Sequence, residues 1–267
     1  MSYGICYQGS KNKIAKEIIR ALPAGRRLVD LFGGGFAISH CALLSGKWDT
    51  VLYNDINPLL GPLIQDAIAG HYNYENFTPE FISRDRFHAE KMSDGYIKWI
   101  WSFGGNGWDY IYSYKEEENK RKAHEEYFSG KRANVTIRLD HVERLERLQK
   151  LSTLAGLPLE MTNADYREYK YQDGDIVYCD IPYQNAADTR LYKQYNLKFD
   201  HGAFYEWAIT APFQVYFSSY KLGGIVWERD VNGTMCVKNN NMRREVLYCV
   251  DDDFTPPGQF YQGHLFT

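Results

Sequence analysis

The stretch RLVDLFGGG at residues 27–35 decides the fold class of this chain. Its first six residues form a short, mainly apolar run, which is typical of a buried strand, and three glycines follow directly. Glycine lets the backbone pass close to a ligand at the carboxyl end of a strand. A second run, residues 50–54, leads to Asp55 about 20 residues after the glycines, which is the spacing of a ribose-binding acid. The pattern predicts an α/β sheet with a nucleotide-type ligand at its edge.

The same glycines also fit a tight strand-to-helix turn that binds no ligand. Their spacing differs from the GxGxxG fingerprint of dinucleotide-binding proteins, and this disfavours nicotinamide and flavin. A choice between the two interpretations therefore needs a second motif.

Strand and helix patterns lie on both sides of a central region of different composition. Strands are predicted at 159–162, 175–180 and 213–219, a terminal hairpin at 225–229 and 244–250, and helices at 11–22 and 37–45. The central region contains a Trp- and Gly-rich stretch, a charged run and an amphipathic segment at 139–151, which indicates a mostly helical insertion. We predict a catalytic domain at 1–70 and 155–267 and an inserted domain at 71–154.

The second motif is the tetrapeptide DIPY at residues 180–183, directly after an apolar strand pattern. An aromatic amine is a weak nucleophile because its lone pair is delocalised into the ring. Asp180 and the carbonyl of Ile181 can accept hydrogen bonds from the two amine hydrogens and free that lone pair. Pro182 biases Ile181 toward an extended backbone, and Tyr183 offers a ring on which an extruded base can stack. An ordinary loop would fit the tetrapeptide alone, but its position downstream of the glycine turn favours a catalytic loop.

These motifs together resemble the Dam-type (D12 class) family of DNA adenine N6-methyltransferases. The resemblance is carried by YQGSK at 7–11, VDLFGGG at 29–35, YNDIN at 53–57 and DIPY at 180–183, which stand in the family's order. Two weaker matches are Asp165-Tyr166 and the Gly/Asn-rich stretch SFGGNG at 102–107, near the start of the family's target-recognition region. The resemblance covers about residues 1–110 and 160–250.

The resemblance implies a Rossmann-like class I methyltransferase sheet, with residues 71–154 as a mostly helical target-recognition domain. It implies S-adenosylmethionine as the cofactor and double-stranded DNA with an adenine-containing site as the partner, with the adenine flipped out of the duplex. The implied catalytic residues are Asp180, Ile181, Pro182 and Tyr183. The implied cofactor-binding residues are Tyr7, Lys11, Asp30, Phe32, Gly33, Gly34, Gly35, Asp55, Asp165 and Tyr166.

The sequence departs from the family's pattern in two places. Ile181 stands where the catalytic motif usually has proline. Because the acceptor there is a main-chain carbonyl, we expect the chemistry to be retained. The family's recognition hairpin is not found in residues 110–150, so no target sequence is carried over to this chain.

Contact with DNA requires local positive charge, because the formal net charge of the chain is -3. The basic residues of the insertion are Lys120, Arg121, Lys122, Lys131, Arg132, Arg138, Arg144, Arg147 and Lys150. The run at 115–126 mixes both signs of charge and equally fits a solvated helix. The residues that we predict to contact DNA are Asn106, Lys131, Arg132 and Arg138. Trp99, Trp101 and Trp108 are predicted to belong to the core rather than to a base-stacking surface.

The cysteines, the histidines and the apolar runs of the sequence argue against several classes of protein. The five cysteines are scattered, no histidine shows ligand spacing, and neither a disulfide framework nor a metal site is indicated. No signal-peptide or membrane-spanning run is present, so we expect a soluble, cytoplasmic protein that is a monomer or a weak dimer, of the kind found in restriction-modification systems and phages. Two alternatives stay open: methyl transfer to RNA or to a protein amide, and a catalytically silent module that binds the cofactor and DNA.

Overall fold

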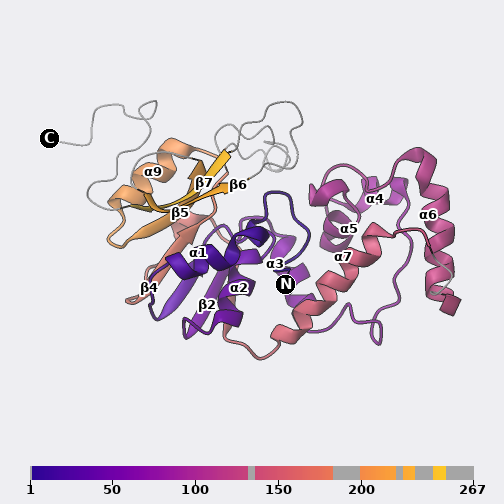
Figure 1. The fold of residues 1–267 in the computed structure, drawn as a ribbon, viewed down its shortest axis with the longest axis horizontal. Helices are drawn as coiled ribbons and strands as arrows, with labels where there is room; N and C mark the ends of the chain where they lie inside the picture. Colours follow the sequence, from indigo (N-terminus) through magenta and orange to yellow (C-terminus); the bar gives the residue numbers. More distant parts are fainter. Residues whose placement is uncertain (1, 132–135, 183–198, 221–224, 232–242, 251–267) are drawn as a thin grey trace. The chain divides into compact units, whose positions relative to one another are not determined.

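The chain folds into two compact units, which Figure 1 shows as ribbons. The structure is a computed structural model that describes residues 2–131, 136–182, 199–220, 225–231 and 243–250. One unit, here called the helical unit, contains Met1–Lys13, Gly34–His40 and Asn57–Leu157. The other, here called the sheet unit, contains Ile14–Gly33, Cys41–Ile56 and Pro158–Thr267. The assignment of catalytic and recognition functions to 1–70 with 155–267 and to 71–154 stays a prediction.

The sheet unit is built on one seven-stranded sheet in the order β3-β2-β1-β4-β5-β7-β6. The strands are β1 (Arg27–Asp30), β2 (Thr50–Asn54), β3 (Leu159–Thr162), β4 (Asp175–Cys179), β5 (Val215–Tyr220), β6 (Ile225–Val231) and β7 (Arg243–Val250). Strands β1 to β5 are parallel, and β7 is antiparallel to both of its neighbours. The strand order reverses between β1 and β4, as at the switch point of a doubly wound sheet. The predicted Rossmann-like α/β fold is therefore confirmed.

Apolar residues at every second position give the sheet one face that packs against helix α9 (His201–Thr210). Val29, Val177 and Phe217 on three neighbouring strands join Phe204 and Ala208 of α9 in a single buried cluster. Asp200 caps the start of α9 by accepting a hydrogen bond from the backbone N–H of residue 203 at 3.0 Å. The cluster fixes α9 over β1, β4 and β5, whose carboxyl ends carry the candidate site.

An ion-pair network joins three strands at the amino-terminal edge of the sheet. Both carboxylate oxygens of Asp175, at the start of β4, accept hydrogen bonds of 2.9 Å from the guanidinium of Arg27, at the start of β1. The same guanidinium donates to Glu160 of β3 at 2.9 Å, and the Tyr169 hydroxyl donates to Asp175. Despite its burial, the pKa of Asp175 lies below its usual value because these donors favour the carboxylate. The network joins strands that are far apart in the sequence.

Two further helices precede β1 and β2 in the chain, and the first of them differs from its predicted bounds. The helix expected at 11–22 is divided into a 3-10 turn at Lys11–Lys13 and helix α1 at Ala15–Ala21. The carbonyls at the end of α1 bind the ammonium of Lys47, at 2.9 Å from the oxygen of Ile19, as suits the negative end of a helix dipole. Helix α2 (Ala37–Ser45) has the predicted bounds. Its first turn belongs to the helical unit and its remainder to the sheet unit.

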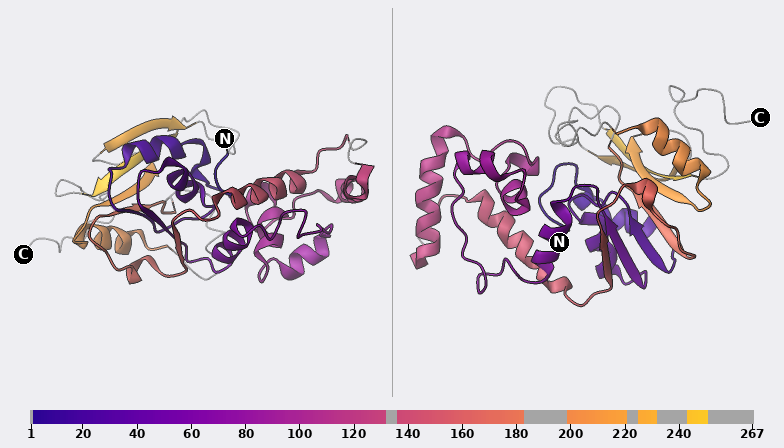
Figure 2. Two further views of the ribbon diagram at one scale, coloured as in Figure 1. Left: turned by 90° about the horizontal axis from the view of Figure 1, so that it is seen from below. Right: turned by 180° about the vertical axis from the view of Figure 1, so that it is seen from behind.

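The helical unit contains the helices α3 (Leu60–Ile68), α4 (Arg84–Glu90), α5 (Gly95–Ile100), α6 (Tyr114–Glu126) and α7 (Asp140–Gln149), drawn from further sides in Figure 2. Short 3-10 turns follow at Phe103–Gly105 and Lys150–Leu154, and a π turn at Tyr127–Lys131. Trp99 and Trp101 are fully buried, as predicted, whereas Trp108 is 39% exposed. The insertion is therefore mostly helical, and one of the three tryptophans reaches its surface.

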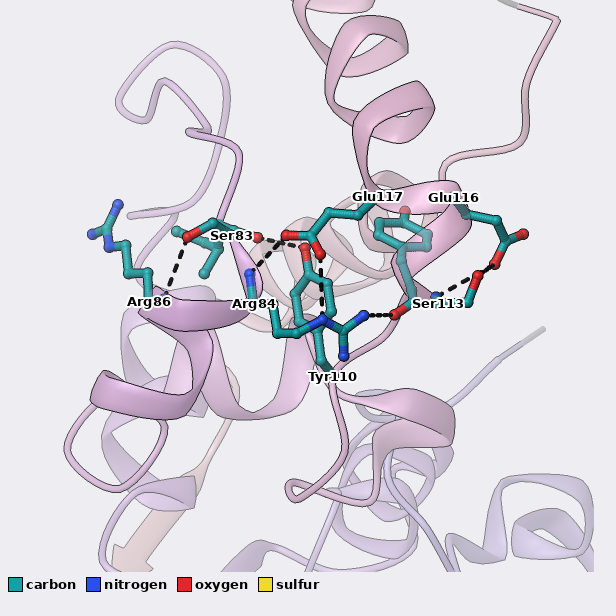
Figure 3. A network of polar contacts seen from close by, with 9 residues as sticks. Ser83, Arg84, Arg86, Tyr110, Ser113, Glu116 and Glu117 are labelled. Carbon is teal, nitrogen blue, oxygen red and sulfur yellow. Dashed lines mark hydrogen bonds and ion pairs between the residues drawn. The ribbon is translucent and has the colours of Figure 1, made fainter.

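The starts of α4 and α6 are joined by polar contacts, drawn in Figure 3. The guanidinium of Arg84 donates to the Glu117 carboxylate at 3.3 Å and to the backbone carbonyl of Tyr112. Ser113 and Glu116 form a reciprocal capping box at the start of α6. The rest of α6 carries ion pairs along its own surface, between Arg121 and both Glu118 and Glu125 among others. The solvated-helix interpretation of the charged run thus agrees with the structure.

A buried hydrogen-bond chain crosses the centre of the helical unit. The Tyr112 hydroxyl lies 2.6 Å from Nδ1 of His141, whose Nε2 lies 2.9 Å from Nδ1 of His124, and Nε2 of His124 lies 3.2 Å from the carbonyl of Pro79. Because a carbonyl only accepts, a consistent direction runs from the tyrosine through two neutral histidines. Burial lowers the pKa of both histidines.

Among the described residues no helix is both long and apolar enough to cross a membrane.

Candidate active site

Acidic side chains follow four parallel strands at the same edge of the sheet. Asp30 ends β1, Asp55 follows β2, Asp165 follows β3 after a short loop, and Asp180 follows β4. In the sheet, Asp30 pairs in register with Tyr53 of β2 and Tyr178 of β4. Because these strands are parallel, all four acids belong to the carboxyl-terminal edge, and β1 and β4 flank the switch point where doubly wound sheets bind ligands.

The turn after β1, Gly33–Gly35, is held tightly against the end of β2. The N–H of Gly33 donates to the carbonyl of Asn54 at 2.8 Å, and a Cβ at Gly33 would lie 2.3 Å from the ring of Tyr53. Gly34 has a φ of 45°, and Phe36 has a φ of 68°, which is unusual for a residue with a bulky side chain. A left-handed conformation costs a non-glycine residue such as Phe36 about 1–3 kcal/mol, and such residues concentrate at functional turns. Glycine is thus required here by close packing as well as by backbone conformation.

Asn54 organises the strand ends, and sequence reasoning did not single it out. Its side-chain amide donates to the carbonyls of Leu31 and Ala164, at 3.0 Å each. Its side-chain oxygen accepts from the Thr162 hydroxyl at 2.8 Å and from the N–H of Ala164 at 3.0 Å. Asn54 is 3% exposed, so this fully used amide fixes the loops that follow β1 and β3 relative to Asp55. The polar residue at the end of an otherwise apolar strand was the available signal.

The loop after β3 carries the predicted pair Asp165 and Tyr166. The Asp165 carboxylate accepts hydrogen bonds from the backbone and guanidinium of Arg167, which hold its pKa below the usual value. The Tyr166 ring lies 5.3 Å from that of Phe32 and 5.1 Å from that of Trp207, centroid to centroid. Burial raises the pKa of Tyr166 to about 12. Two predicted cofactor residues, Phe32 and Tyr166, are therefore brought together in one aromatic cluster.

In the helical unit, Tyr7 packs on the second half of the glycine turn. A Cβ at Gly35 would lie 2.4 Å from Cβ of Tyr7, and one at Gly34 would lie 3.1 Å from its ring. Lys11 is 8% exposed, and its ammonium lies 3.3 Å from the carbonyl of Gly9. The two predicted N-terminal cofactor residues are thus half-buried and buried, respectively, and Tyr7 contacts the turn directly.

The motif after β4 is held by its flanking residues. Ile181 is 2% exposed and belongs to the core cluster under α9, which accounts for an apolar side chain at the position where proline is usual. The carbonyl of Pro182 accepts a hydrogen bond of 2.6 Å from Nε2 of His201, the first residue of α9. Asp180 is half-buried, and Tyr183 lies outside the described residues. His201 was given no role from the sequence, because its partner is a backbone carbonyl that no motif encodes.

Comparison with known families identifies the class of protein. The model of the D12 class N6 adenine-specific DNA methyltransferases matches residues 7–154, which is more than half of the chain. The chain belongs to this family.

A structural comparison finds the rRNA methyltransferase aviRa from Streptomyces viridochromogenes, with 15% sequence identity, a TM-score of 0.37, and coverage of 89% of this chain and 84% of that chain. Comparison with curated proteins gave no match. Membership of the D12 class makes the chain a methyltransferase, and such enzymes use S-adenosylmethionine as the methyl donor.

The residues of this D12 methyltransferase that are predicted to contact DNA differ in the groups that their side chains bind. Asn106 uses its side chain to close the loop Ser102–Tyr110: its oxygen accepts from the N–H groups of Trp108 and Asp109, and its amide donates to the Asp109 carboxylate at 2.9 Å. Arg138 is exposed and pairs with Asp140 and Glu143. The side chain of Lys131, and Arg132 as a whole, lie outside the described residues. Arg144 and Arg147, two basic residues of the same region, instead point to backbone carbonyls of their own unit.

Proposed function

We propose that this chain transfers the methyl group of S-adenosylmethionine to the exocyclic N6 amine of adenine in DNA. One observation supports this above the others: in a D12 methyltransferase, the glycine turn and Asp180 follow two adjacent parallel strands, β1 and β4, at the switch point of the sheet. A methyl donor and an amine acceptor have to meet within reacting distance, and this edge carries a motif for each.

The residues present fit S-adenosylmethionine. Gly33 lets the turn lie directly against the Tyr53 ring, where a Cβ would clash, and the aromatic cluster of Phe32 and Tyr166 suits a flat adenine. Asp55, which follows β2, would bind the ribose hydroxyls, and Asp165 would lie near the adenine. In the helical unit, Tyr7 and Lys11 would contact the methionine end. When bound, S-adenosylmethionine supplies an activated methyl group.

The chain's own residues would then prepare the amine. The Asp180 carboxylate and the Ile181 carbonyl would accept hydrogen bonds from its two N–H groups, and Tyr183 would stack on the base. Ile181, anchored in the core, and the hydrogen bond from His201 to Pro182 would keep these acceptors in place. Much of the acceleration would come from holding the reactants in line. Extrusion of the base from the duplex costs roughly a few kcal/mol.

DNA would be bound through Arg138, Lys131, Arg132 and the loop that Asn106 closes. Arg138 already has two acidic neighbours, so binding a phosphate would require exchange of these partners. Phosphate contacts release counterions, and the affinity for DNA should therefore fall steeply as salt is raised.

The decisive experiment is transfer of labelled methyl from S-adenosylmethionine to unmethylated DNA, followed by mass spectrometry of the nucleosides. N6-methyladenine is the expected product. Cofactor binding without any product on DNA would reject the proposal, and the same assay with RNA and with protein substrates would then separate another acceptor from a catalytically silent module.

A further inference from the structure

The N-terminal segment Ser2–Gln8, here called the strap, is bound to the glycine turn within the helical unit. The N–H of Ile5 donates to the carbonyl of Gly35 at 2.8 Å, and the N–H of Gly4 donates to Nδ1 of His40 at 3.0 Å. Gly4 has a φ of 62°, and a Cβ there would lie 2.1 Å from the Gly35 carbonyl oxygen. The strap therefore sets where Tyr7 lies on Gly34 and Gly35.

The strap is also held by the helices of the same unit. Arg147 of α7 donates from Nε to the carbonyl of Gly4 at 2.7 Å and from a second guanidinium nitrogen to the carbonyl of Tyr3. Trp99 of α5 is fully buried, and its ring centroid lies 4.9 Å from that of Tyr7. The N–H of Gln8 donates to the carbonyl of Gly105 at 3.0 Å, and a Cβ at Gly105 would lie 2.6 Å from the Cys6 oxygen.

These contacts make the strap a bridge between the insertion and the turn. Hydrogen bonds from a charged guanidinium are stronger than neutral ones, and the two from Arg147 act on consecutive carbonyls of the strap. Trp99 and Gly105 leave no room for Tyr7 to move back from the turn without displacing buried backbone or a buried ring. The position of Tyr7 is thus set by residues of the insertion, the part of the chain that is predicted to recognise the substrate.

We propose that the strap couples the positions of α5 and α7 to the affinity of the chain for S-adenosylmethionine. Arg147, Trp99 and Gly105 are then positioning residues, which act on the cofactor through Tyr7. The inference rests on the proposed function, since it takes Tyr7 and the glycine turn as cofactor contacts. It assigns to Arg147 a role in cofactor affinity rather than in binding a DNA phosphate.

The test measures the Kd for S-adenosylmethionine by calorimetry, which should change in parallel with KM, and the steady-state kinetics of full-length Arg147→Met and Arg147→Lys with unmethylated DNA, varying S-adenosylmethionine and DNA separately. We expect Arg147→Met to raise KM for S-adenosylmethionine about tenfold or more, which corresponds to the loss of one charge-assisted hydrogen bond. The value of kcat and KM for DNA should stay within about twofold, and Arg147→Lys should recover part of the affinity because one donor remains. A partly unfolded sample lowers the apparent kcat but leaves KM unchanged, so a merely structural role gives a different result.

Two matched controls are available in the helical unit. Arg84→Met also removes a part-buried arginine that donates to a backbone carbonyl, but Arg84 contacts Tyr112 and Glu117 rather than the strap, so KM for S-adenosylmethionine should not change. Gly105→Ala should raise that KM, whereas Gly156→Ala should not; both glycines have positive φ, but a Cβ at Gly156 meets nothing within 4 Å.

The strap proposal would be overturned by an unchanged KM for S-adenosylmethionine in Arg147→Met, or by an equal rise in Arg84→Met. An effect of Arg147→Met on KM for DNA alone would also overturn it and would add Arg147 to the candidate DNA-contacting residues. Absence of methyl transfer and of cofactor binding in the unaltered protein is a separate outcome, which rejects the proposed function itself.

Discussion

Acidification is expected to destabilise the fold through His40, which lies in α2 and holds the strap. His40 is 6% exposed, and its Nδ1 accepts the hydrogen bond from the N–H of Gly4. Burial, together with the nearby charge of Arg147, lowers its pKa to about 4. A protonated His40 has no lone pair at Nδ1 and cannot accept this hydrogen bond. The imidazole of His40 therefore stays neutral in the folded protein at pH values below 6.5 at which it becomes protonated in the unfolded chain.

The sign and size of the effect follow from proton linkage. Between pH 6.5 and about 4 the unfolded chain binds more protons at this position than the folded protein, so the free energy of unfolding falls as the pH falls. Each pKa unit corresponds to about 1.4 kcal/mol, and at pH 4.5 the loss from His40 alone reaches about 2.5 kcal/mol. This is a large fraction of the stability of a typical domain.

The assay is guanidinium chloride unfolding of the unaltered protein and of His40→Asn between pH 7 and pH 4.5. The asparagine oxygen can still accept from Gly4 but does not titrate, while the other histidines titrate equally in both proteins. The unaltered protein should lose about 2.5 kcal/mol more than His40→Asn over this range. Parallel pH dependences in the two proteins would refute the assignment of His40 as a buried neutral acceptor.

Three further changes have definite expected outcomes. Asp180→Ala should lower kcat by at least about 100-fold while S-adenosylmethionine binding, measured by calorimetry, persists; near-normal turnover would remove Asp180 from the catalytic residues. Ile181→Ala should cost about 2–5 kcal/mol in denaturant unfolding because the side chain is 2% exposed, and a loss under about 1 kcal/mol would contradict its place in the core. Arg27→Met should cost about 3–5 kcal/mol because it leaves the buried Asp175 carboxylate without its main partner, and an unchanged unfolding midpoint would show that the network adds nothing to stability.

Patterns within single segments were read correctly where one physical signal dominates. The strand at 159–162 and the helix at 37–45 have the predicted bounds, because apolar runs and their flanking turn residues are local properties. The helix predicted at 139–151 exists as α7, since the apolar stripe of Val142, Leu145 and Leu148 fixes its buried face. The predicted helix at 11–22 failed at its start, where Lys11–Lys13 form a 3-10 turn: periodicity locates a helix better than it locates its first residue.

The sequence predicted which residues belong to the candidate site, but it did not predict the contacts that hold those residues. Phe32 and Tyr166 were expected from the family resemblance, and the fold brings their rings to 5.3 Å. Asn54 and His201 were missed because each acts on backbone carbonyls of another segment. Such partners carry no side-chain signature, and only the folded chain determines which carbonyl a donor reaches.

The sequence by itself determined the class of fold, the family and the identity of the chemical groups, because strand periodicity, glycine spacing and short motifs are written along the chain. The tertiary structure alone decided which way each charge points. Arg147 and Arg138 are both basic residues of the same insertion, yet Arg147 turns inward to the strap carbonyls and Arg138 remains exposed beside two acids. A charge on a helix has several partners within reach of a long side chain, and the packing of segments distant in sequence selects among them.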